Sequence, residues 1–131
     1  MLPSRVCLRA IELHFASIHV LADNLAEVFV NEDVVVDEAC IAEYHHALAS
    51  LFDRSFGLIV NRMNPYTYSE YAKYNIADIA NLEAIALLDI LNCQLSSSNR
   101  DNALPQIKNK HFRHFCDREA ALQWLESLLD E

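Results

Sequence analysis

The stretch Phe56-Gly57-Leu58-Ile59-Val60 decides the fold of this chain. It is apolar without interruption and ends at the polar pair Asn61-Arg62. A strand that is apolar on both faces belongs inside a sheet covered by helices, as parallel strands are. A second apolar run, Ala84 to Leu91, is interrupted only by Asp89 and is interpreted in the same way. The two runs predict the centre of a largely parallel sheet.

Upstream of this centre the sequence predicts a β-hairpin. Two apolar stretches, Phe15 to Leu21 and Leu25 to Val30, are joined by the polar turn residues Asp23-Asn24. We expect the hairpin to add one antiparallel strand at or near an edge of the sheet.

Helical segments alternate with the strands that follow. Asp37 and Ser69 are suitable N-caps for helices that reach about Phe52 and Ile79. A short, weak helix is expected after the loop at 96–99, and Asp117 caps a last helix that follows a strand at 111–116. The order β-β-α-β-α-β-α-β-α predicts a single α/β domain over residues 1–131, with about five strands and about four helices.

The composition indicates a folded globular protein. The chain is 53% hydrophobic and 22% charged, and its formal net charge is −9. A negative field repels nucleic acid and anionic lipid headgroups, and no apolar stretch approaches the roughly 20 residues of a membrane helix. We expect neither nucleic-acid binding nor membrane insertion.

Four cysteines, Cys7, Cys40, Cys93 and Cys116, lie far apart within apolar runs. There is no C-x-x-C pair and no secretory leader pattern at the start of the sequence. We interpret all four as reduced and buried, and the protein as cytoplasmic; two disulfides are the alternative.

The sequence lacks the usual motifs for nucleotide binding, metal binding and catalysis by a cysteine. Gly57 is the only glycine, so the glycine-rich loops that bind mononucleotides and dinucleotides are excluded. The six histidines show no metal-binding spacing, and the acidic neighbours of Cys40 would raise the pKa of its thiol. We expect no metal, no cofactor and no enzymatic activity.

One loop stands apart, Asn61-Arg62-Met63-Asn64-Pro65-Tyr66-Thr67-Tyr68-Ser69, because it is dense in hydrogen-bonding and aromatic side chains. It leaves the carboxyl end of a central strand, the edge where α/β sheets bind ligands and partners, and Asn92 and Asp117 are expected at the same edge. The alternative is a well-capped turn in which Asn64-Pro65 makes the bend, Ser69 caps the helix and the tyrosines pack on the surface.

Four parts of the chain together resemble small bacterial STAS-like (SpoIIAA-like) proteins. They are the hairpin, Asn31-Glu32-Asp33-Val34, Asn61-Arg62-x-Asn64-x-Tyr66-Thr67 and Asp117-Arg118-Glu119-Ala120-Ala121-Leu122-x-Trp124-Leu125. The resemblance covers nearly the whole length and implies a SpoIIAA-like βα superhelix, an architecture shared with certain lipid-binding domains. It also implies a role through protein contact.

In anti-sigma-factor antagonists of this family, a serine in a strand-to-helix loop is phosphorylated within an Asp-Ser-Ser/Thr-Gly pattern. This chain lacks that pattern and offers only Thr67 and Ser69 in the equivalent stretch. These two residues are therefore its candidate phosphorylation sites.

The sequence thus favours a non-enzymatic STAS-like interaction or regulatory module that contacts a protein partner, with a homodimer as one form of that contact. The expected partner-binding residues are Asn61, Arg62, Asn64, Tyr66, Thr67 and Ser69. We expect Arg62→Ala or Tyr66→Ala to weaken binding without unfolding the protein. The alternative function is a carrier or sensor of a small apolar, lipid-like ligand, and an enzyme ranks third.

Overall fold

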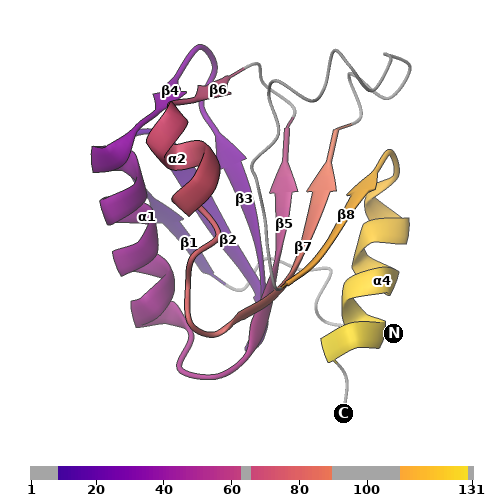
Figure 1. Ribbon diagram of the computed structural model, residues 1–131. Coiled ribbons are helices and arrows are strands. Elements are labelled where there is room, and N and C mark those ends of the chain that lie inside the picture. Colours follow the sequence, from indigo (N-terminus) through magenta and orange to yellow (C-terminus); the bar gives the residue numbers. More distant parts are fainter. Residues whose placement is uncertain (1–8, 63–65, 90–109, 130–131) are drawn as a thin grey trace.

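The computed structural model describes residues 9–62, 66–89 and 110–129. In these residues one mixed sheet has the strand order β1-β2-β3-β5-β7-β8, and β4 and β6 form a separate two-stranded ladder (Figure 1). The strands are β1 (Arg9–Glu12), β2 (Ala16–Ala22), β3 (Leu25–Val30), β4 (Val35–Val36), β5 (Phe56–Asn61), β6 (Thr67–Tyr68), β7 (Leu82–Leu88) and β8 (His111–Phe115). The helices are α1 (Glu38–Leu51), α2 (Glu70–Asn75) and α4 (Arg118–Leu129).

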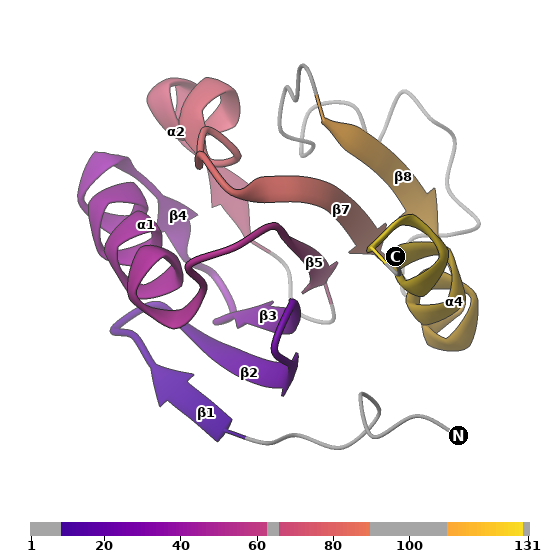
Figure 2. The ribbon, with the colours of Figure 1, turned by 90° about the horizontal axis from the view of Figure 1, so that it is seen from below.

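The centre of the sheet is parallel, as predicted. β5 pairs in parallel with β3 on one side and β7 on the other, and β7 pairs in parallel with β8. Helices α1 and α2 lie over one face of the sheet, and α4 lies over the other (Figure 2). Successive residues of β5 therefore enter two different cores: Leu58 packs in the core beneath α1, and Ile59 packs in the core beneath α4. The uninterrupted apolar run follows from this double burial.

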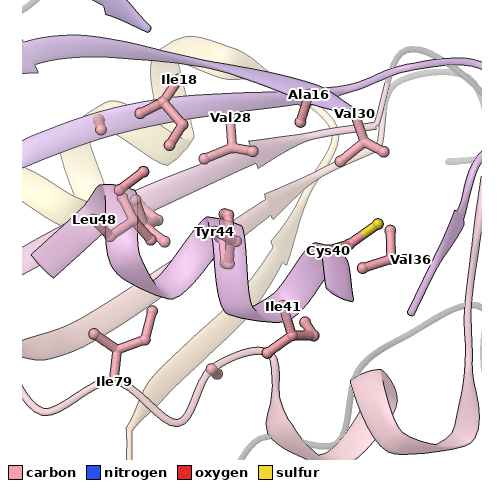
Figure 3. Packing of buried hydrophobic residues seen from close by; sticks show 14 of the residues in the cluster. Ala16, Ile18, Val28, Val30, Val36, Cys40, Ile41, Tyr44, Leu48 and Ile79 are labelled. Carbon is pink, nitrogen blue, oxygen red and sulfur yellow. The ribbon is translucent and has the colours of Figure 1, made fainter. Parts of the chain in front are cut away.

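The core beneath α1 shows why that helix forms where it does. Cys40, Ile41, Tyr44 and Leu48 line the buried side of α1 and face sheet residues such as Ile18 and Val28 (Figure 3). Their spacing of three and four residues places them on one stripe of the helix, which is the pattern seen in the sequence.

The N-terminal hairpin is confirmed, with one additional strand. β2 and β3 pair antiparallel around Asp23-Asn24, and β1 pairs antiparallel with β2 at the edge of the sheet. Strand β1 is not predictable from the sequence, because its residues, Arg9–Glu12, are mostly exposed and carry no alternating apolar pattern. Within the described residues the sheet therefore has six strands, where about five were expected.

The three predicted N-caps in the described residues are confirmed. Asp37 accepts a hydrogen bond from the Cys40 amide at 3.1 Å, Ser69 from the Ala72 amide at 3.1 Å, and Asp117 from the Ala120 amide at 2.9 Å. The bond from Cys40 lowers the pKa of Asp37, because the amide stabilises the charged carboxylate.

Helix α2 ends earlier than expected, at Asn75 instead of about Ile79. The Asn75 side-chain amide donates to the Tyr71 carbonyl at 2.8 Å, a local bond of the kind that competes with helix continuation. The weak helix expected after residues 96–99 lies outside the described residues.

The cysteine prediction is only partly correct. Cys40 is a free, buried thiol as expected, but Cys116 is disulfide-bonded, and its partner lies outside the described residues. Disulfides persist mainly in oxidising compartments, so this bond does not support the expected cytoplasmic location. Among the residues that the structure describes, no helix combines the length and apolar character needed to span a bilayer.

Gly57 is the point of closest approach between β5 and α4. A Cβ atom there would lie 2.8 Å from Leu129 Cδ1 and 3.2 Å from Leu125 Cδ2. A glycine at this position lets the helix settle on the strand.

We predict that Gly57→Val lowers the free energy of unfolding by about 1–3 kcal/mol, measured by urea denaturation, because the added side chain overpacks this interface. Leu129→Ala removes the nearest obstacle, so the double variant should lose less than the sum of the two single losses. Strict additivity would contradict the proposed clash.

Candidate functional site

Two buried charged residues follow the carboxyl ends of β5 and β7. Arg62 Nη1 lies 3.8 Å from Asp89 Oδ2, and both side chains are buried. The Arg62 backbone amide donates to the Leu88 carbonyl at 2.8 Å, which continues the β5–β7 pairing by one residue. The pair therefore joins the ends of two neighbouring central strands.

Arg62 also makes two contacts with Tyr66. Its Nη2 donates to the Tyr66 carbonyl at 3.1 Å, and its guanidinium carbon lies 4.7 Å from the centre of the Tyr66 ring. The Tyr66 and Tyr68 hydroxyls are 3.2 Å apart. Burial raises the pKa of both phenols, so they stay neutral hydrogen-bonding groups at physiological pH.

A second polar cluster lies between β3, β5 and α4. The buried Glu27 carboxylate accepts hydrogen bonds from Arg118 Nη2 at 2.7 Å, Arg118 Nε at 3.1 Å and Asn61 Nδ2 at 2.8 Å. A two-pronged contact of this kind fixes orientation as well as distance. The cluster holds the first turn of α4 against the sheet.

Some of the predicted loop residues therefore have buried side chains, and others have exposed ones. Asn61, Arg62 and Tyr66 make contacts inside the fold, and Arg62 and Tyr66 are only 6% and 4% exposed. This burial argues against the expectation that either can be replaced without a loss of stability. Thr67 is exposed, whereas Ser69 is half-buried and caps α2.

The other residues expected at this edge are not seen to add to the site. Asn64 and Asn92 lie outside the described residues, and Asp117 caps α4. In the alternative interpretation of the loop, the cap by Ser69 is present, but Tyr66 is buried and does not pack on the surface.

A set of exposed apolar residues beside the loop was not predicted from the sequence. Val35, Tyr71 and Tyr74 are 57%, 45% and 56% exposed, and they are the large hydrophobic residues exposed in the described part of the chain. Val35 is the register partner of Thr67 in the β4–β6 ladder, so the two side chains leave the ladder on the same side. Tyr71 and Tyr74 are three residues apart on α2 and share one face of it.

One cavity lies beneath α1 and α2, within the core. Its volume is about 20 Å³, which is enough for one water molecule and far below the 300–1,000 Å³ typical of pockets for small molecules. It is lined by apolar and aromatic side chains that include Phe15, Val28, Tyr44, Tyr68 and Phe112.

Within residues 9–62, 66–89 and 110–129, no group of three or more histidine, cysteine, aspartate or glutamate side chains is arranged to hold a metal ion. Comparisons of the chain with protein-family models, curated proteins and solved structures find no match.

We predict that Arg62→Met lowers the free energy of unfolding by about 3–5 kcal/mol, because it removes a cation from beside the buried Asp89 carboxylate. The measurement is urea denaturation followed by circular dichroism. Arg62→Met combined with Asp89→Asn should recover part of the loss, since no buried charge is then left behind. A loss below about 1 kcal/mol for the single variant would show that the pair is not structural.

Proposed function

We propose that this chain is a non-enzymatic, STAS-like protein-interaction or regulatory module. Its partner binds the corner formed by β4, β6 and α2, which Figure 1 shows at one end of the molecule. The observation that carries the proposal is that Val35, Tyr71 and Tyr74, the large hydrophobic residues exposed in the described part of the chain, all belong to this corner. Grouped apolar side chains on a surface mark interaction sites, whereas single ones are ordinary.

The residue types at the corner suit a protein partner. Tyrosine is enriched at interfaces because its ring supplies a large contact area while its hydroxyl keeps a hydrogen bond. Acidic residues border the apolar set: Glu32 and Asp33 precede β4, Glu38 begins α1 and Glu70 begins α2, and all four are exposed. This arrangement favours a partner with an apolar centre and a basic rim.

The corner is held rigidly from inside. The β4–β6 ladder is closed by bonds from the Thr67 amide to the Val34 carbonyl at 3.1 Å and from the Ser69 amide to the Val36 carbonyl at 2.8 Å. Behind the ladder, Arg62 holds the Tyr66 carbonyl. A surface ordered before binding loses little conformational entropy when the partner arrives.

In this proposal the residues of the 61–69 loop have different roles. Arg62 and Tyr66 support the surface, and Thr67 lies on it beside Val35. Of the two candidate phosphorylation sites, Thr67 is the accessible one, because the Ser69 hydroxyl caps α2. A phosphate on Thr67 would bring negative charge next to the apolar contact and oppose binding.

We predict that the double variant Tyr71→Ser/Tyr74→Ser weakens partner binding by at least about thirtyfold, because aromatic hot-spot residues cost more than about 1 kcal/mol each when truncated and about 2 kcal/mol in total is roughly thirtyfold in Kd. Its unfolding free energy should stay within about 0.5 kcal/mol of that of the unsubstituted protein, because both side chains are exposed.

The experiment captures partners from an extract of the source cells, identifies them by mass spectrometry and measures the Kd of the purified pair by calorimetry. Gln123→Ser, at an exposed position of α4, is the control. Sedimentation velocity of the protein alone tests the case in which the partner is a second copy. If both variants bind as tightly as the original chain, the corner is not the binding surface.

A further inference from the structure

A cysteine, a histidine and a glutamate from separate segments meet at the start of α1. Cys40 and Glu43 lie in the first turns of that helix, and His14 lies in the turn between β1 and β2. The Cys40 sulfur is 4.0 Å from His14 Nε2. The other ring nitrogen, His14 Nδ1, contacts Glu43 Oε1, and the His14 backbone amide donates to Glu43 Oε2 at 3.3 Å.

The contacts orient His14 so that it can act as a base toward Cys40. A carboxylate can only accept, so the contact with Glu43 places the ring proton on Nδ1. With that proton on Nδ1, Nε2 presents its lone pair to the Cys40 thiol. Nucleophile, base and orienting carboxylate follow one another as in the triads that activate serine and cysteine.

The surroundings keep the thiol protonated until it reacts. Burial is the main cause that raises the pKa of Cys40; a backbone hydrogen bond at Asp37 offsets part of this rise, and the charges of Asp37 and Glu43 raise the pKa further. A buried thiol of this kind needs a base at the moment of attack, which is the position that His14 occupies. Figure 3 shows the Cys40 side chain at the N-terminal end of α1, near Val36.

Access to the sulfur is narrow. Cys40 itself is buried, while the His14 side chain beside it is 65% exposed. The imidazole is therefore the exposed group beside the buried sulfur, and a small reagent suits such a site better than a large one. A small peroxide meets this requirement.

We propose that Cys40 is a modification site for small hydroperoxides, with His14 as the base and Glu43 as the residue that positions it. The sulfur attacks one peroxide oxygen, so that an S–O bond forms as the O–O bond breaks. The thiol proton passes to His14 Nε2 and from there to the departing oxygen, so that hydrogen peroxide releases water and an alkyl hydroperoxide releases an alcohol. The sulfur is oxidised to sulfenic acid and the peroxide is reduced.

The experiment exposes the full chain to hydrogen peroxide at pH 7, traps sulfenic acid with dimedone and follows the Cys40 peptide by mass spectrometry. Peptide mapping separates Cys40 from the other cysteines. We expect His14→Gln to slow adduct formation by at least about tenfold, because general bases contribute roughly 10²–10⁴-fold in closed sites and this one is partly open to water. Glu43→Gln should slow it less, and Glu43→Asp should restore part of the rate.

The matched control is His46→Gln, an exposed histidine on the same helix, which should react like the unsubstituted chain. Circular dichroism verifies that each variant is folded, and if His14→Gln is not, Glu43→Gln carries the test. Two results would overturn the proposal. One is an equal rate in the original chain and in His14→Gln; the other is an adduct that forms only after the chain is unfolded in urea.

Discussion

The burial of β5 on both faces is the constraint on which the rest of the structure depends. Leu58 faces the core beneath α1, Ile59 faces the core beneath α4, and Gly57 allows α4 to approach closely. A strand in this position has parallel neighbours on both sides, and its residues 56–59 are buried. Polar groups can enter only where it ends, and this determines where the chain places its charges.

The two internal charge clusters follow from that constraint. Arg62 and Asp89 sit just beyond the ends of β5 and β7, and Glu27 on β3 is reached by Asn61 at the end of β5 and by Arg118 on α4. A buried charge without a partner is costly, so each is matched by an opposite charge or a hydrogen-bond donor. The matching fixes Arg62 just after β5 and Arg118 at the start of α4, and it directs the charged groups of Arg62 and Asp89 inward.

The elements that could be predicted are those that leave a local pattern of apolar or capping residues in the sequence. The parallel centre, the hairpin and the caps Asp37, Ser69 and Asp117 were predictable, because burial and capping leave local patterns. The edge strand β1 was not, because its order comes from pairing with β2 and its own residues are exposed. The inward orientation of Arg62 could not be predicted either, because only the tertiary fold identifies its partners Asp89 and Tyr66. The same holds for His14 and Cys40, which are far apart in the sequence.

The strand order explains why the carboxyl end of β5 is not the exposed binding edge that was expected for an α/β sheet. From β3 through β5 and β7 to β8, each strand is added on the same side of the previous one, so the parallel part never reverses direction. Ligand crevices in open α/β sheets form where the order reverses, because the loops then diverge to opposite faces. In this sheet, which has no reversal, Arg62 and Tyr66 occupy the end of β5. The exposed apolar residues lie instead on the neighbouring elements β4 and α2, next to β6. The exposed apolar residues at that corner and the buried Arg62 and Tyr66 after β5 are therefore two consequences of one topology.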